Sequence, residues 1–256
     1  MNKIAKINSY YEKNFKELEK LHDALSKAAK SNINADNYKI LGWESRQAQY
    51  ARFAAFAKNV DLNGKAVLDV GCGLGDLFHF LTSGLGLSVN YVGIDISERM
   101  IETAKGQLEI LRENGLKLPA ENKSTVRFLT ADVFADDFVN ALDFSALEES
   151  SAGFDWIYAS GIFNLNLGNN FEFLKKAFVR FMELGKSGFV CSMLNERSSD
   201  KESPYFYYNP KQVCSFAKDA GAKSVRIIDD YLENDFTVLQ KNKDAVPTGV
   251  EPVFRP

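Results

Sequence analysis

A glycine-rich turn directly follows a short hydrophobic segment in the sequence VLDVGCGLGD, residues Val67–Asp76. Gly71, Gly73 and Gly75 permit a tight turn and let the backbone approach a ligand closely. Asp69 lies just before the turn, where its carboxylate can bind an ammonium group. The motif therefore predicts a ligand-binding turn between a strand and a helix.

Two further aspartates end the next two predicted strands. Asp95 closes the segment YVGID, and Asp132 follows the segment LTA. In a doubly wound sheet, Asp95 can accept hydrogen bonds from both hydroxyls of a ribose. Asp132 can accept one from an adenine amino group, beside the apolar wall of Val133. Each feature also occurs as an ordinary turn or helix cap, but the order of all three favours a nucleoside site.

The position of Asp76 distinguishes between two nucleoside cofactors. The NAD fingerprint needs a third glycine there, and a carboxylate at the start of a helix would repel the diphosphate that this fingerprint binds. S-adenosylmethionine (SAM) has no phosphate, and its amino acid end carries an ammonium group that suits Asp69. The sequence therefore favours SAM and disfavours an NAD-dependent dehydrogenase.

The three motifs VLDVGCGLGD, YVGIDIS and LTADVF resemble the first three motifs of class I SAM-dependent methyltransferases, in the same order and at suitable spacing. The resemblance extends from about Val60 to Lys241. It implies a seven-stranded sheet and assigns three groups of residues to SAM: Asp69, Gly71, Cys72 and Gly73 to the methionine part, Asp95 and Ile96 to the ribose and adenine, and Asp132 and Val133 to the adenine edge.

Three other segments, WESRQAQYARF, SGIFN and DDYLENDFTVL, resemble a subgroup of bacterial methyltransferases without a firm substrate. In that subgroup Trp43, Gln49 and Arg52 would lie near the amino acid end of SAM. Arg52 as the partner of the SAM carboxylate is a hypothesis based on its fork of donors, and the alternative is a solvated side chain. Ser160 could contact the cofactor and Asn164 could orient an acceptor, although both could be turn residues.

Alternating strands and helices are predicted to position these residues. The predicted strands are Lys65–Val70, Tyr91–Ile96, Thr125–Ala131, Phe154–Ser160, Lys186–Leu194, Lys223–Asp229 and Phe236–Lys241. Helical spacing of apolar residues predicts helices at Asn8–Lys30, Glu44–Lys58, Gly75–Leu85, from Ser97 onward, Asn170–Leu184 and Pro210–Ala220. Surface insertions are expected at Gly115–Lys123 and Asp136–Gly153.

These elements predict an α/β fold: a doubly wound, seven-stranded, mostly parallel sheet with an antiparallel C-terminal hairpin strand and an N-terminal helical cap. The hairpin is expected because no helix separates the last two strands. The expected organisation is a cap or lid at residues 1–59, a SAM-binding domain at 60–241 and a tail at 242–256.

Composition narrows the class of protein. Of the 256 residues, 45% are hydrophobic and 25% are charged, a composition that argues against disorder. The net charge of −3 argues against a nucleic-acid partner, because binding to phosphates favours a positively charged protein. No apolar run approaches the ~18 residues of a membrane span, and no signal peptide is evident. Three scattered cysteines indicate reduced thiols in a cytoplasmic protein, and with two histidines no metal site is predicted.

The predicted activity is SAM-dependent methyl transfer to an oxygen or nitrogen atom of a small molecule. An RNA or protein methyltransferase and a non-catalytic SAM-binding protein are the alternatives. The aromatic clusters Tyr10–Tyr11 and Tyr205–Tyr208 could wall an acceptor pocket or pack the cap against the sheet. The sequence does not identify a residue that would act as a general base. It does not predict the oligomeric state.

Overall fold

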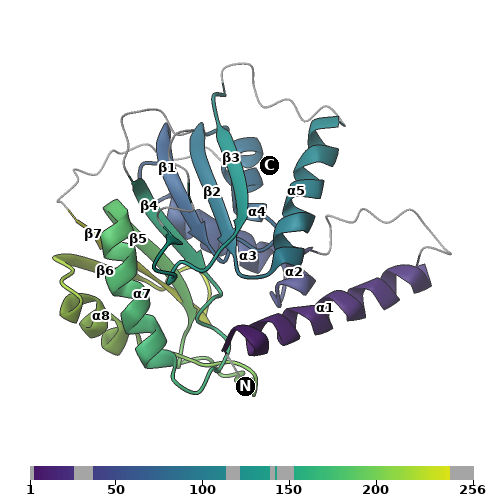
Figure 1. Cartoon of the computed structure of the whole chain (residues 1–256). Helices are drawn as coiled ribbons and strands as arrows, with labels where there is room; N and C mark the ends of the chain where they lie inside the picture. The colour runs from purple at the N-terminus through teal and green to yellow at the C-terminus, as the bar shows by residue number, and fades with distance from the viewer. Residues whose placement is uncertain (1–2, 26–36, 114–121, 139–141, 143–152, 243–256) are drawn as a thin grey trace.

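A seven-stranded sheet forms the centre of the protein (Figure 1). The computed structural model describes residues 3–25, 37–113, 122–138, 142 and 153–242. The strand order is β3-β2-β1-β4-β5-β7-β6. The strands are β1 (Lys65–Val70), β2 (Val89–Asp95), β3 (Thr125–Thr130), β4 (Phe154–Ser160), β5 (Gly185–Leu194), β6 (Ser224–Ile228) and β7 (Asp235–Lys241).

The predicted sheet topology is confirmed. Strands β1 to β5 pair in parallel, and β7 is antiparallel to both β5 and β6. Val67 of β1 pairs with Tyr91 of β2 on one side and with Trp156 of β4 on the other. The chain first adds β2 and β3 on one side of β1, and then adds β4 and β5 on the other side. Because the strand order reverses between β1 and β4, a crevice is expected at the carboxyl ends of these two strands.

Helices cover both faces of the sheet (Figure 1). They are α1 (Lys3–Leu25), α2 (Asn37–Ile40), α3 (Arg46–Ala57), α4 (Asp76–His79), which continues as the π-helical turn η2 (Phe80–Gly84), α5 (Glu98–Glu113), α7 (Asn170–Leu184) and α8 (Pro210–Asp219). The hydroxyl of Ser45 accepts a hydrogen bond from Ala48 N at 3.0 Å and so caps the start of α3. Asn209 caps α8 in the same way.

The core consists of two main layers, because strand side chains alternate between the faces. Leu68 of β1 packs in the cluster that contains the buried residues of α7 and α8. Val67 packs in the cluster that contains residues of α3, α4 and α5. Leu174, Phe178 and Phe181 of α7 are fully buried, and Phe171 is partly buried against the same cluster.

The N-terminal region differs in detail from the prediction. Helix α1 begins at Lys3 rather than Asn8, and the short helix α2 was not predicted. Figure 1 shows α1 across one edge of the sheet, with its second half extending away from the rest. None of the described helices is long and apolar enough to cross a membrane.

Several predictions fall on residues that the structure does not describe. They concern the end of the first helix, most of the two expected insertions, and the tail at 243–256. The proposed boundaries of the cap, domain and tail therefore remain predictions.

Candidate functional site

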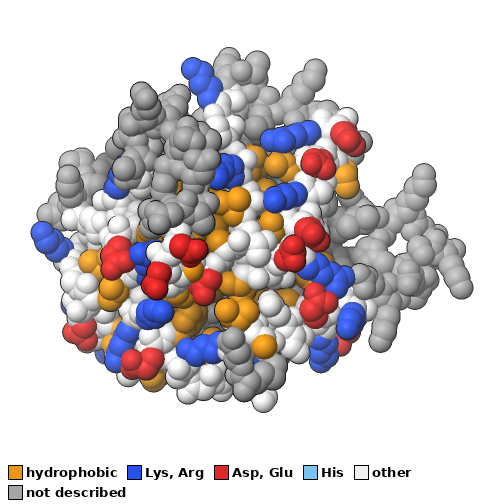
Figure 2. Space-filling model, viewed as in Figure 1, with side chains coloured by type: hydrophobic (Ala, Val, Ile, Leu, Met, Phe, Trp, Pro, Cys, Tyr) orange, Lys and Arg blue, Asp and Glu red, His pale blue; other side chains and the backbone are white. Residues whose placement is uncertain are grey.

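A cavity of about 570 Å³ lies at the carboxyl ends of β1, β2, β3 and β4. Figure 2 shows hydrophobic side chains near the centre of the face seen in Figure 1, with acidic and basic side chains around them. Every residue predicted to bind the cofactor except Arg52 lines the cavity: Trp43, Asp69, Gly71, Cys72, Gly73, Asp95, Ile96, Asp132, Val133 and Ser160. The fold thus brings together residues from four strand ends.

The glycine turn requires glycine for both conformation and space. Gly71 has φ +76°, and a Cβ atom there would lie 2.1 Å from Ile162 Cγ2. Gly73 has φ +54°, and a Cβ atom would lie 2.6 Å from Leu41 Cδ2. Side chains at either position would therefore be strained and would fill the space between the turn and its neighbours. This geometry fits a ligand that lies close to the backbone.

Asp69 is buried beside the turn, where it accepts a hydrogen bond from the Tyr91 hydroxyl. Burial raises the pKa of Asp69 to about 7; the hydrogen bond from Tyr91 opposes this increase, and the nearby Asp95 and Asp76 add to it. A cationic group beside Asp69 would favour its ionised form. The carboxylate therefore suits the ammonium group of an amino acid.

Asp95 and Asp132 both anchor local backbone while they face the cavity. Asp95 Oδ2 accepts a hydrogen bond from Gly73 N at 3.1 Å, and Oδ1 accepts one from Ser97 N at 2.9 Å. Burial raises the pKa of Asp95, and its backbone hydrogen bonds oppose that increase. Asp132 Oδ1 accepts from Phe134 N at 2.9 Å. Each oxygen retains a further lone pair for a ligand.

Two hydroxyl groups near the end of β4, those of Tyr158 and Ser160, belong to the cavity wall. The Tyr158 hydroxyl is buried and interacts with the hydroxyls of Ser160 and Ser192. Each hydroxyl can donate one hydrogen bond and accept two, so both retain capacity for a ligand. Ser160 was proposed as a cofactor contact, whereas Tyr158 lies inside a predicted hydrophobic strand and carried no sequence signal.

Arg52 is buried, so the alternative of a solvated side chain is wrong. It forms an ion pair with Asp235 of β7, donates to Ala48 O at 2.7 Å, and lies 4.3 Å from the centre of the Trp43 ring. Burial raises the pKa of Asp235 to about 6, although Arg52 opposes the increase. Arg52 thus already has a carboxylate partner, while its proposed contact with SAM remains a hypothesis.

Replacing Arg52 by alanine is expected to lower the free energy of unfolding by about 3–5 kcal/mol, because the buried Asp235 loses its cation. Urea denaturation measures this loss. The double variant Arg52→Met/Asp235→Asn should lose less, since no unpaired charge remains buried. Equal losses in the single and double variants would contradict the ion-pair argument. An unchanged dissociation constant for SAM in folded Arg52→Ala would exclude Arg52 from SAM binding.

The structure adds two residues to the cavity that the sequence prediction did not assign to the cofactor, Tyr11 and Asp76, and it places Gln49 there as well. Tyr11 of α1 lines the cavity, and so do Gln49 and Asp76, which are joined by a hydrogen bond of 3.0 Å from Gln49 Nε2 to Asp76 Oδ2. Gln49 had been placed near the amino acid end of SAM by resemblance alone. Asp76 was used only as an argument against NAD, although its position at the start of α4 was a usable signal.

Comparisons with known proteins agree on one family. A family model described as a methyltransferase domain matches residues 61–242. A demethylmenaquinone methyltransferase from Lactococcus lactis subsp. lactis (strain IL1403) is 39% identical over 72 residues, 25% of this chain and 29% of the relative. The match therefore spans less than a third of that relative.

Solved structures with similar folds have low sequence identity. The CurJ carbon methyltransferase has a TM-score of 0.51 and 15% identity, covering 81% of this chain and 57% of that one. The [4+2]-cyclase SpnF has a TM-score of 0.50 and 15% identity, covering 77% and 81%. At such identities these two proteins support the fold and nothing finer.

Proposed function

We propose that this chain, which belongs to the methyltransferase domain family, transfers a methyl group from SAM to an oxygen or nitrogen atom of a small molecule. The observation that carries this proposal is the cavity at four strand ends, with Asp69, Asp95 and Asp132 in its wall and helix α1 against it. Cavities of this size suit small ligands.

The roles proposed for the three aspartates follow from their chemistry. Asp69 would hold the ammonium group of SAM, Asp95 the ribose hydroxyls and Asp132 the adenine amino group. When bound, SAM would supply a methyl group on a positively charged sulfur, which would leave with the electron pair of the carbon–sulfur bond. An acceptor oxygen or neutral nitrogen would provide the lone pair for the new bond to carbon; an ammonium would first have to lose a proton to solvent. The protein then mainly aligns the acceptor and excludes water.

Helix α1 supports the proposal that residues 1–59 act as a cap. The hydroxyls of Tyr10 and Tyr205 are hydrogen-bonded at 2.7 Å. Glu12 pairs with Arg99 of α5 at 2.8 Å, and Ile7 lines the cavity. These contacts join α1 to the loop after β5 and to α5, so the cap would exclude water from the reacting atoms.

The charges in the cavity wall argue against a polyanionic acceptor. The wall contains five acidic residues and two lysines: Asp69, Asp76, Asp95, Asp132, Glu172, Lys3 and Lys176. An RNA acceptor would be repelled by such an excess of carboxylates.

The three free thiols are consistent with the proposed cytoplasmic location, because reduced cysteines are usual there.

Two measurements test the proposed function. Calorimetry should detect binding of SAM and its product S-adenosylhomocysteine to the full chain. Incubation of the protein and a cell filtrate with SAM that carries an isotope-labelled methyl group should then place the label on an oxygen or nitrogen of a small molecule. Label on carbon, or only on macromolecules, would contradict the proposed acceptor. Binding without any product would leave a non-catalytic SAM-binding protein.

Binding of SAM is expected to weaken as the pH falls through 7. The empty site holds Asp69 with a pKa of about 7, and the ammonium of SAM, which stays charged below about pH 7.7, prefers the ionised carboxylate. Protonation should therefore weaken SAM binding roughly fivefold between pH 7 and pH 6. Calorimetry at several pH values measures the profile. Asp69→Asn should flatten it, and an equally steep profile in that variant would assign the effect to another group.

A further inference from the structure

A second cavity, of about 680 Å³, adjoins the first. The two cavities share the side of the wall formed by Tyr11, Leu41, Trp43, Gly161 and Leu165. A ligand in the second cavity would thus lie next to the first cavity, beside residues from α1, from the segment after α2 and from the loop after β4. The three aspartates assigned to SAM, Asp69, Asp95 and Asp132, do not line the second cavity.

The shared wall is closely packed around Trp43. A Cβ atom on Gly161 would lie 2.9 Å from Trp43 Cη2, and Gly161 has φ +88°. The guanidinium of Arg52 covers the ring of Trp43, and Asp235 neutralises that guanidinium. The wall between the cavities is therefore positioned by buried contacts rather than by exposed side chains.

The second cavity is lined by an excess of acidic residues. Glu44, Asp200, Glu202 and Glu233 belong to its wall, and Arg52, already paired with Asp235, is its basic residue within the described part of the chain. Each of the four acids is exposed, so each alone attracts a cation weakly. A concave surface lined by one sign of charge focuses the field and concentrates ligands of the opposite sign.

Aromatic rings in the same wall add a second attraction for cations. Five line the cavity: Tyr10, Tyr11, Trp43, Tyr205 and Tyr207. Ammonium groups bind over such rings through the ring quadrupole. Two of these rings already contact a cation of the protein: Lys201 Nζ lies 5.9 Å from the centre of the Tyr207 ring, and the Arg52 guanidinium lies 4.3 Å from the centre of the Trp43 ring.

A buried acceptor atom completes the set. Asn164 also belongs to the wall, and the residue is only 8% exposed. Its Oδ1 has no hydrogen-bond partner within the described residues. A buried, unpaired carbonyl oxygen favours a ligand that brings an N–H donor.

We propose that the second cavity binds a positively charged amine of the methyl acceptor, so that the acceptor is an ammonium-bearing small molecule. This inference rests on the proposed function and names the substrate class for the same site. The acidic residues attract the cation, the aromatic rings and Asn164 hold it, and the rest of the acceptor would extend past Gly161 and Trp43, which line both cavities, toward the methyl group of SAM.

The test uses three probes of equal chain length on the full chain saturated with S-adenosylhomocysteine: hexamethylenediamine, hexamethylene glycol and adipate. Calorimetry should detect the diamine with an affinity about tenfold or more above those of the uncharged and anionic probes. Saturation of the first cavity keeps the diamine from binding there.

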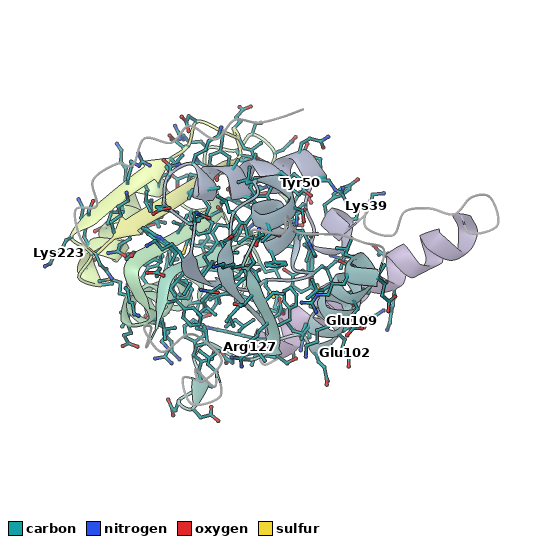
Figure 3. The ribbon with its side chains drawn as sticks, turned by 90° about the horizontal axis from the view of Figure 1, so that it is seen from above. Lys39, Tyr50, Glu102, Glu109, Arg127 and Lys223 are labelled. Atoms are coloured by element: carbon teal, nitrogen blue, oxygen red, sulfur yellow. The ribbon has the colours of Figure 1, made fainter. Side chains whose placement is uncertain are left out.

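Two variants locate the binding. Glu202→Gln/Glu233→Gln should weaken diamine binding about fivefold or more, since two carboxylates leave the wall, and Asn164→Leu should also weaken it. The matched control is Glu102→Gln/Glu109→Gln, which removes two exposed carboxylates on α5. Figure 3 labels both at the periphery of the molecule, and this variant should bind the diamine like the native protein.

The outcomes separate this inference from the proposed function. Failure of S-adenosylhomocysteine to bind would remove the methyltransferase assignment itself. If it binds, but the diamine shows no advantage over the glycol or binds equally to all variants, only the inference about the second cavity is overturned. Binding of a lysine-containing peptide without binding of the diamine would likewise contradict a small-molecule acceptor.

Discussion

Asp95→Ala is expected to weaken SAM binding about a hundredfold or more. In our assignment, Asp95 accepts hydrogen bonds from both ribose hydroxyls, and each hydrogen bond to a charged group contributes about 1.5–3 kcal/mol. The same carboxylate holds Gly73 N at 3.1 Å and Ser97 N at 2.9 Å. The variant therefore loses ligand contacts and also releases the glycine turn.

Calorimetry with SAM measures the effect, and circular dichroism verifies the fold of each variant. Asp95→Asn should fall between the native protein and Asp95→Ala, because the amide keeps one acceptor oxygen. Asp137→Ala removes an exposed aspartate after β3 and serves as the control. Native affinity in a folded Asp95→Ala protein would exclude the ribose assignment and, with it, the proposed arrangement of SAM.

The strand ends could be predicted from sequence because their signals are local. The segment VLDVGCGLGD combines a buried strand, left-handed glycines and an acid within a few residues, and parallel strands bring their carboxyl ends to one edge. The structure therefore brings Asp69, Asp95 and Asp132 into one cavity as expected. Strands β1 and β4 and helix α7 also have the predicted limits.

Contacts between distant segments could not be predicted in this way. Arg52 and Asp235 are 183 residues apart, and no local pattern shows that α3 packs beside the start of β7. The prediction that Arg52 binds a carboxylate had the right chemistry, but it did not identify an internal carboxylate as the partner. Such a partner depends on how the elements pack.

The helix after the glycine turn was harder to predict for another reason. Its apolar spacing suggested one helix from Gly75 to Leu85, but α4 has a single turn and η2 continues it as a π-helical turn. Gly75 has φ +80° and precedes the helix instead of starting it. Periodicity reports which side of a segment is buried, and it does not distinguish α from π hydrogen bonding.

Gly71→Ala is expected to abolish measurable SAM binding and to lower stability. A residue with a Cβ atom at φ +76° is strained by about 1–2 kcal/mol. The new methyl group would also lie 2.1 Å from Ile162 Cγ2, and a β-branched side chain has little freedom to move away. The turn and the loop after β4 would be forced apart, and both line the cavity. Calorimetry and thermal unfolding measure the two effects.

Two further variants separate backbone strain from the steric clash. Gly64 has φ +72°, and a Cβ atom there would meet nothing within 4 Å, so Gly64→Ala should show the strain without the clash and should keep native affinity for SAM. Gly71→Ala/Ile162→Ala removes the clash but not the strain, so it should recover part of the binding. If this double variant binds no better than Gly71→Ala, contact with Ile162 is not what excludes the side chain. The requirement for glycine would then lie in the left-handed backbone or in the space that SAM itself occupies.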